Sequence, residues 1–253
     1  MKHDFIDKYS TLDSSVHRLD PRTKVLFSLL FLVIVTSVAS IPSLAIYLLF
    51  ALVLVIISKV PIHFFIEKIM LITPLAFLFS AFIYISYLIE HSRSFSISMF
   101  SIHYSVLDTI VPIVMKIYIS VLIVTLLVSS TRFNDLLWAL RKLKFPSIVT
   151  TLSKLVYTYI FLFIDEMHRT MRAYRSRTPI RRISRIKAYG SITAGILTRS
   201  MNRSEYIYKA MMSRGFSGEF PECRINRFKS LDIIALFLFL AIIILEKFIS
   251  WKM

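Results

Sequence analysis

Long apolar segments constrain the fold of this 253-residue chain more than any other feature. Five such runs occupy residues 25–40, 44–58, 69–89, 106–130 and 231–251. A helix needs about 20 mostly apolar residues to cross a bilayer, and it satisfies its backbone polar groups internally. With 56% hydrophobic residues and a mean hydropathy of +0.69, the chain is predicted to be an all-α membrane protein with about five transmembrane helices.

The first two runs are short, and the tripeptide Ile41-Pro42-Ser43 lies between them. A single helix over residues 25–58 would be too long for one span and would carry Pro42 in its interior. Proline inside a helix removes a hydrogen bond and clashes with the preceding turn. We therefore predict two short spans joined by a tight turn at residues 41–43. In the third run, Pro74 predicts a kink.

The positive charge is concentrated in one block of the chain. The net charge is +16, and residues 130–230 hold 20 Lys and Arg residues against 6 Asp and Glu residues. Basic residues favour the cytoplasmic side of a membrane protein. Five spans with a cytoplasmic N-terminus place this block inside, together with residues 1–24 and 59–68, whereas merging the first two spans would place it outside. This topology leaves only Arg93, Lys247 and Lys252 as basic residues outside.

These charges divide the chain into four predicted parts. They are a cytoplasmic segment (1–24), four transmembrane helices (25–130), a cytoplasmic block of basic helices (131–230) and a last span (231–253). Within the basic block, residues 148–164 are apolar enough to resemble a further span. A lone span there would move most of the following basic residues outside, so we interpret it as an amphipathic helix on the inner membrane surface.

Local capping patterns predict where several helices begin and end. Asp20 followed by Pro21 predicts the start of the first membrane helix. The basic block is predicted to hold three helices: residues 133–144, one from Pro146 to about Arg177, and one from about Ser184 to Arg214. Gly215 follows the third helix directly, as expected of a C-terminal cap.

The second and third of these basic helices end with the same pattern, A-x-x-S-R. It occurs as Ala173 to Arg177 and again as Ala210 to Arg214, 37 residues apart. Ala and Ser three residues apart share one helix face, where small side chains let a partner approach closely. An arginine at the end can bind a partner's carboxylate or backbone carbonyls in a forked arrangement. Ordinary capping of the helix C-terminus by a basic residue is the alternative interpretation.

No catalytic constellation accompanies these helices. The sequence lacks a P-loop, a G-x-S-x-G nucleophile motif and an H-E-x-x-H zinc motif, and its six histidines form no metal-binding pair at helical spacing. We therefore predict neither enzymatic activity nor a cofactor.

The charged residues of the basic block have other predicted roles. The carboxylates of Asp165 and Glu166 are predicted to pair with Arg169 or Arg172. The basic block is predicted to face membrane lipids or an acidic partner rather than nucleic acid.

Three stretches of the chain resemble the transmembrane T components of energy-coupling factor transporters. They are FIDKYSTLDSSVHRLDPRTK (5–24), the stretch from FNDLLWALRKLK to RAYRSR (133–177), and SEYIYKAMMSRGFSGEFP (204–221). The resemblance covers nearly the whole chain in order and is greatest for the cobalt-type branch called CbiQ. It implies membrane helices plus a cytoplasmic coupling domain in the cell membrane, which agrees with the topology predicted above.

The resemblance also implies how the chain would act. Two short X-Arg-X motifs of the family dock onto two ABC-type ATPase subunits, and they map here to Ser176-Arg177-Thr178 and Ser213-Arg214-Gly215. Thr178 departs from the small residue that often follows the first arginine, so Arg175 is an alternative contact. Further implied partners are a membrane subunit that captures the substrate and a small accessory membrane subunit. The implied function is non-catalytic coupling of ATP hydrolysis to cobalt or nickel import.

Two alternatives remain at this level. A T component shared by vitamin importers would have the same motifs. A self-sufficient carrier would instead need polar residues lining a path through the membrane. The polar candidates for such a path are Asp108 and Lys116, both on the fourth predicted span.

Overall fold

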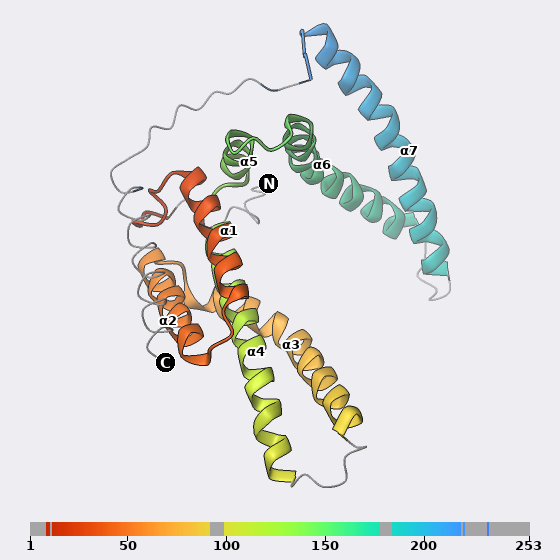
Figure 1. Ribbon diagram of the computed structural model, residues 1–253. Helices are drawn as coiled ribbons and strands as arrows, with labels where there is room; N and C mark the ends of the chain where they lie inside the picture. The colour runs from red at the N-terminus through yellow and green to blue at the C-terminus, as the bar shows by residue number, and fades with distance from the viewer. Residues whose placement is uncertain are drawn as a thin grey trace. The chain divides into compact units, whose positions relative to one another are not determined.

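The computed structural model describes residues 9–10, 12–91, 99–177, 184–218, 220 and 232. Within this part of the chain every regular element is an α-helix, which confirms the predicted all-α membrane protein (Figure 1). The helices are α1 (Pro21–Ser37), α2 (Ile41–Ser58), α3 (Ile62–His91), α4 (Met99–Ser130), α5 (Phe133–Lys142), α6 (Ser147–Arg177) and α7 (Ser184–Ser213).

The chain divides into two compact units. Residues 4–139 and 225–253 form the α1–α4 unit, and residues 1–3 and 140–224 form the α6–α7 unit. The boundary falls within α5, so the chain leaves the first unit through this helix. It returns at residue 225, shortly before the last predicted span.

Four helices among the described residues are long and apolar enough to cross a membrane, namely α2, α3, α4 and α6. The first three coincide with predicted spans. The first predicted span corresponds to α1, which has 17 residues, and the last lies outside the described residues apart from Asp232. The interfacial position of α6 and the total of five spans stay predictions.

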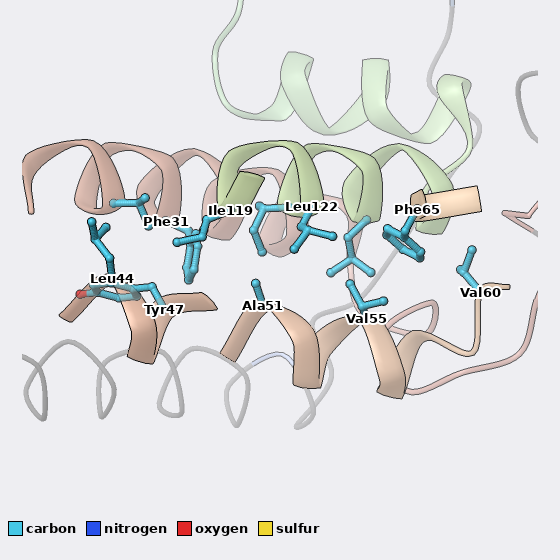
Figure 2. Close-up of a cluster of buried hydrophobic side chains, with 12 residues drawn as sticks. Phe31, Leu44, Tyr47, Ala51, Val55, Val60, Phe65, Ile119 and Leu122 are labelled. Atoms are coloured by element: carbon cyan, nitrogen blue, oxygen red, sulfur yellow. The ribbon is translucent and has the colours of Figure 1, made fainter. Parts of the chain in front are cut away.

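The core of the α1–α4 unit forms where α4 packs against α1, α2 and α3. Its buried side chains recur every three or four residues along α1, α2 and α4, so they share one face of each helix. The ring of Phe31 on α1 meets that of Tyr47 on α2 edge to face, with ring centroids 5.6 Å apart, and both are fully buried. Ala51 of α2 and Ile119 and Leu122 of α4 continue this core (Figure 2). Close packing of this kind stabilises helix pairs in a bilayer, where lipid is as apolar as the side chains.

The turn between α1 and α2 differs from the prediction. It comprises residues 38–40, and Ile41-Pro42-Ser43 forms the first turn of α2 instead of the connection. The reason is that the N–H groups in a helix's first turn have no partner within the helix, so proline loses no hydrogen bond there. The prediction of two separate helices is confirmed, whereas the turn at 41–43 is wrong.

The caps of α1 and α7 confirm the local predictions. The carboxylate of Asp20 accepts a hydrogen bond from the backbone N–H of Arg22 at 2.9 Å, and Pro21 begins the helix. At the end of α7, the N–H groups of Gly215 and Phe216 donate to the carbonyls of Met212 and Met211, both at 3.0 Å. This pair of bonds is a Schellman motif, and it requires the positive φ of 78° that Gly215 adopts.

Lys116, on α4, contacts the end of α1. Its ammonium group donates to the backbone carbonyl of Thr36 at 2.9 Å, one residue before α1 ends. The last carbonyls of a helix have no partner within it and carry partial negative charge. Lys116 therefore stabilises the end of a neighbouring helix, a structural role that accounts for a lysine on this span without a transport path. The side chain of Asp108 lies outside the described residues.

We expect Lys116→Met to lower the free energy of unfolding by about 1 kcal/mol, the usual scale for a cation at a helix C-terminus. Unfolding by SDS titration in mixed micelles measures this change. Lys116→Arg keeps a charged donor and should retain most of the stability. A methionine variant as stable as the wild type would show that this hydrogen bond contributes nothing.

The segment before α1 is organised by His17. The imidazole Nε2 lies 3.1 Å from the carbonyl oxygen of Tyr9, and Nδ1 lies 2.7 Å from the hydroxyl of Ser14. A carbonyl only accepts, so Nε2 carries the proton and Nδ1 accepts from the hydroxyl. Burial lowers the pKa of His17 below its usual value and the nearby Lys24 lowers it further, whereas the bond to Tyr9 acts in the opposite direction.

Acid should therefore destabilise the protein through His17. Its pKa is lower in the folded than in the unfolded state, so the unfolded chain binds more protons and stability falls as the pH drops through about 6.5. We expect the wild type to lose more melting temperature between pH 7.5 and 5.5 than His17→Gln, which keeps an N–H donor for the Tyr9 carbonyl but does not take up a proton in this range. Equal losses in the two proteins would rule out this contribution of His17.

Candidate functional site: two exposed helix ends

The two A-x-x-S-R patterns lie at the C-terminal ends of α6 and α7. Arg177 is the last residue of α6, and Arg214 directly follows Ser213, the last residue of α7. The structure therefore places Arg214 just past a helix end, as the pattern predicts, whereas Arg177 is followed directly by residues outside the described part of the chain. Thr178 and the side chain of Arg177 lie outside the described residues.

The small residues of both patterns are exposed and do not belong to the packed core. Ala173 and Ser176 on α6 are exposed, as are Ala210 and Ser213 on α7. Each serine hydroxyl donates to a carbonyl of its own helix, Ser176 to Ala173 and Ser213 to Lys209, both at 3.0 Å. Because these hydroxyls are already bonded locally, the two surfaces offer shallow, small-residue contact areas rather than polar catalytic groups.

Three further residues of the predicted contacts are exposed in the same way. Arg175 lies on the last turn of α6 with its side chain exposed, so it is accessible as the alternative contact. Arg214 and Gly215 are exposed immediately after α7. The Schellman motif at Gly215 ends the helix sharply, which leaves Arg214 at the tip instead of within a continuing helix.

The two tips lie at opposite ends of α7. The end of α6 lies near the start of α7, and α7 then runs back away from it (Figure 1). With 30 residues and a rise of 1.5 Å per residue, α7 is about 45 Å long. One partner surface of small area could not reach both tips, so the geometry suits two separate docking points.

Polar contacts join α6 and α7. The guanidinium group of Arg199 on α7 lies 3.4 Å from the carboxylate of Glu166 and donates to the hydroxyl of Thr170 at 3.1 Å. The ion pair thus crosses between helices, and the pairing within α6 that the spacing predicted stays a prediction. It holds together the two helices that carry the tips.

A shallow hollow of about 300 Å³ lies beside this ion pair. Apolar side chains of both helices line it together with Arg199, Arg203 and Tyr206, the apolar ones being Leu162, Phe163 and Ile196. Further apolar side chains of α6 are exposed, namely Ile148, Leu152, Val156 and Ile160. These surfaces fit a membrane surface or an apolar partner.

One residue that the sequence marks only as a membrane boundary is buried. Lys24, one residue before the apolar run that begins at Val25, donates to the carbonyls of His17 at 3.1 Å and Ser130 at 2.8 Å. Burial lowers the pKa of Lys24 to about 8, so its ammonium form still predominates at neutral pH. Three carboxylates oppose this shift, those of Asp135, Asp20 and Asp232. The signal for this cluster in the sequence is Asp-Pro-Arg-Thr-Lys at residues 20–24, which places three charged residues at the start of a helix.

Together these features define a membrane protein with a second helical unit, in which two helices carry A-x-x-S-R patterns with exposed small residues. Residues 13–224 match the family described as CbiQ, cobalt transport protein. The chain belongs to this family, whose members are membrane components of transporters rather than enzymes.

Relatives from several organisms support the assignment. The chain is 28% identical over 227 residues to the energy-coupling factor transporter transmembrane protein EcfT of Bacillus subtilis, covering 84% of each chain. It is 26% identical over 227 residues to EcfT of Streptococcus thermophilus, covering 84% of this chain and 85% of that one. An uncharacterized protein of Methanocaldococcus jannaschii, MJ1571, is 25% identical over 247 residues, which are 95% of this chain and 84% of that protein.

Proposed function

We propose that the chain couples ATP hydrolysis on partner subunits to substrate import through a third, substrate-capturing membrane subunit. The observation that carries this proposal is the pair of exposed A-x-x-S-R helix ends, about 45 Å apart along α7. The chain itself performs no chemistry in this scheme. It passes movement of the ATPase subunits along α6 and α7 into the membrane.

The chemistry of the tips fits docking into a groove of another protein. A guanidinium group presents five donors in a rigid fork that suits carboxylates and backbone carbonyls. The alanine and serine beside it leave room for close approach of a partner backbone. Two ATPase subunits, one on each tip, would thus be held at the two ends of one helix pair.

The substrate we propose is cobalt, or the chemically similar nickel ion. The description of the matching family as a cobalt transport protein supports this choice. In our scheme the metal is captured by the separate membrane subunit. The basic block faces the cytoplasm, where the positive-inside rule places it and where ATP is available.

Co-purification from native membranes tests the proposal. We expect the tagged full-length chain to bring down an ABC-type ATPase, identified by mass spectrometry, and a second membrane subunit. The purified assembly in liposomes should take up Co²⁺ only when ATP is supplied. A chain that comes down alone and transports Co²⁺ without ATP would instead establish the carrier interpretation.

A further inference from the structure

A cluster of buried polar residues lies where α1 begins, and we call it the junction cluster: Asp20, Thr23, Lys24, Ser130 and Asp232. All five are buried, and Asp232 is fully buried. The carboxylate of Asp232 accepts hydrogen bonds from the backbone N–H of Asp20 at 2.8 Å and from the hydroxyl of Thr23 at 3.2 Å. Its partners lie more than 200 positions earlier in the sequence, so this contact is purely tertiary.

The charges of the cluster match the helix ends beside them. The Asp232 carboxylate lies at the N-terminus of α1, where unpaired N–H groups and the helix dipole favour negative charge. The Lys24 ammonium lies at the C-terminus of α4, where its bond to the Ser130 carbonyl satisfies one of the last carbonyls of that helix. Each buried ion is therefore compensated by a helix end as well as by the opposite charge.

The chain passes between its two units after residue 139 and again after residue 224. Residues of the junction cluster precede the first of these crossings and follow the second in the sequence. On the outgoing side, α4 ends at Ser130 and the chain continues through α5 to the boundary after residue 139. On the return side, Asp232 lies seven positions after the boundary residue 225 in the sequence. The first turn of α1 makes hydrogen bonds to a residue on each side: Lys24 donates to the Ser130 carbonyl. The Asp20 N–H and the Thr23 hydroxyl donate to the Asp232 carboxylate. This turn also holds α5, because the guanidinium group of Arg22 lies 4.2 Å from the centroid of the Trp138 ring.

We infer that Lys24 and Asp232 are positioning residues that anchor both connections to α1, so that movement of α6 and α7 is transmitted into the membrane helices. This inference rests on the proposed coupling function and adds the residues that would carry the movement across. If Lys24 or Asp232 is replaced, the segment that it binds should be able to move without moving α1. ATPase docking, which takes place at the helix tips in the other unit, should remain.

Two variants that keep side-chain size test this role in the full chain. Lys24→Met removes the ammonium group, and Asp232→Asn removes the charge but keeps an acceptor oxygen. We expect each variant to bring down the ATPase subunits as the wild type does. The number of Co²⁺ ions transported per ATP hydrolysed should fall at least about 10-fold, the scale for losing one hydrogen bond to a charged group.

A second measurement needs no partner subunit. Hydrogen–deuterium exchange of the purified chain should show amide exchange in residues 133–139 about 10-fold faster in Lys24→Met, on the same energetic scale. Val55→Ala, a cavity variant in the core, is the control for general destabilisation and should leave this exchange and the transport ratio unchanged. Lys24→Arg retains the charge and should restore part of the protection.

The outcomes separate this inference from the proposed function. Unchanged exchange in α5 together with an unchanged transport ratio would overturn the positioning role. A transport ratio that follows only thermal stability, with Val55→Ala equally impaired, would overturn it as well. Failure of the wild type to bind any ATPase would refute the proposed function, while the exchange experiment would still decide whether the cluster anchors α5.

Discussion

Replacing both Arg177 and Arg214 by alanine should abolish ATP-dependent uptake and release the ATPase subunits from the chain. Arginines at the centre of an interface commonly contribute about 2 kcal/mol or more each, a factor of about 30 in affinity. Two independent tips therefore make the loss in the double variant much larger than in either single one. Co-purified ATPase, quantified by mass spectrometry, and Co²⁺ uptake into liposomes measure the effect.

Arg172→Ala with Lys209→Ala provides a matched control. Both residues are exposed on the same two helices, each five positions before one of the tip arginines. This variant loses the same charge but leaves the tips intact, so docking should persist. If it impairs docking as severely as the tip variant, general electrostatic attraction rather than the A-x-x-S-R ends binds the ATPase.

Single variants resolve the frame of the first tip. Arg177→Ala should weaken ATPase binding more than Arg175→Ala if the docking frame is Ser176-Arg177-Thr178. The opposite order would assign the contact to Arg175, which is exposed two residues before Arg177.

Phe31→Ala should cause a large loss of stability in the α1–α4 unit. The side chain is fully buried and lies against the rings of Phe27, Tyr47 and Phe50. Truncating a buried phenylalanine typically costs about 3–5 kcal/mol because it leaves a cavity lined by side chains that lose their contacts. SDS titration in mixed micelles should detect this as a much earlier unfolding midpoint.

The position of the phenylalanine decides the size of this effect. Phe82 on α3 is 71% exposed, so Phe82→Ala removes a side chain of the same size from the surface of the described structure. We expect a change below about 0.5 kcal/mol, as for surface positions in general. Similar losses in the two variants would mean that the packing of α1 against α2 and α4 does not determine stability.

Much of the candidate site could be predicted from the sequence because its determinants are local. The repeated A-x-x-S-R pattern and the glycine after the second copy act within one or two helical turns. The structure places the second copy at a helix end and the first in the last described turn of α6. The Schellman motif at Gly215 follows from the one residue type that adopts a positive φ at low cost. Whether the tips bind ATPases remains for the experiments above.

The sequence alone determined the class of the protein, most helix boundaries and the concentration of positive charge in one block. Apolar run length, caps and charge counts depend on neighbours a few residues away, so they can be inferred without a fold. Only the tertiary structure decided which polar groups become buried or paired. Lys24 is buried because Ser130, 106 positions later, supplies a carbonyl, and Glu166 pairs with Arg199 because α7 packs beside α6. The energies of such contacts depend on burial and on distant partners, and no local pattern specifies either.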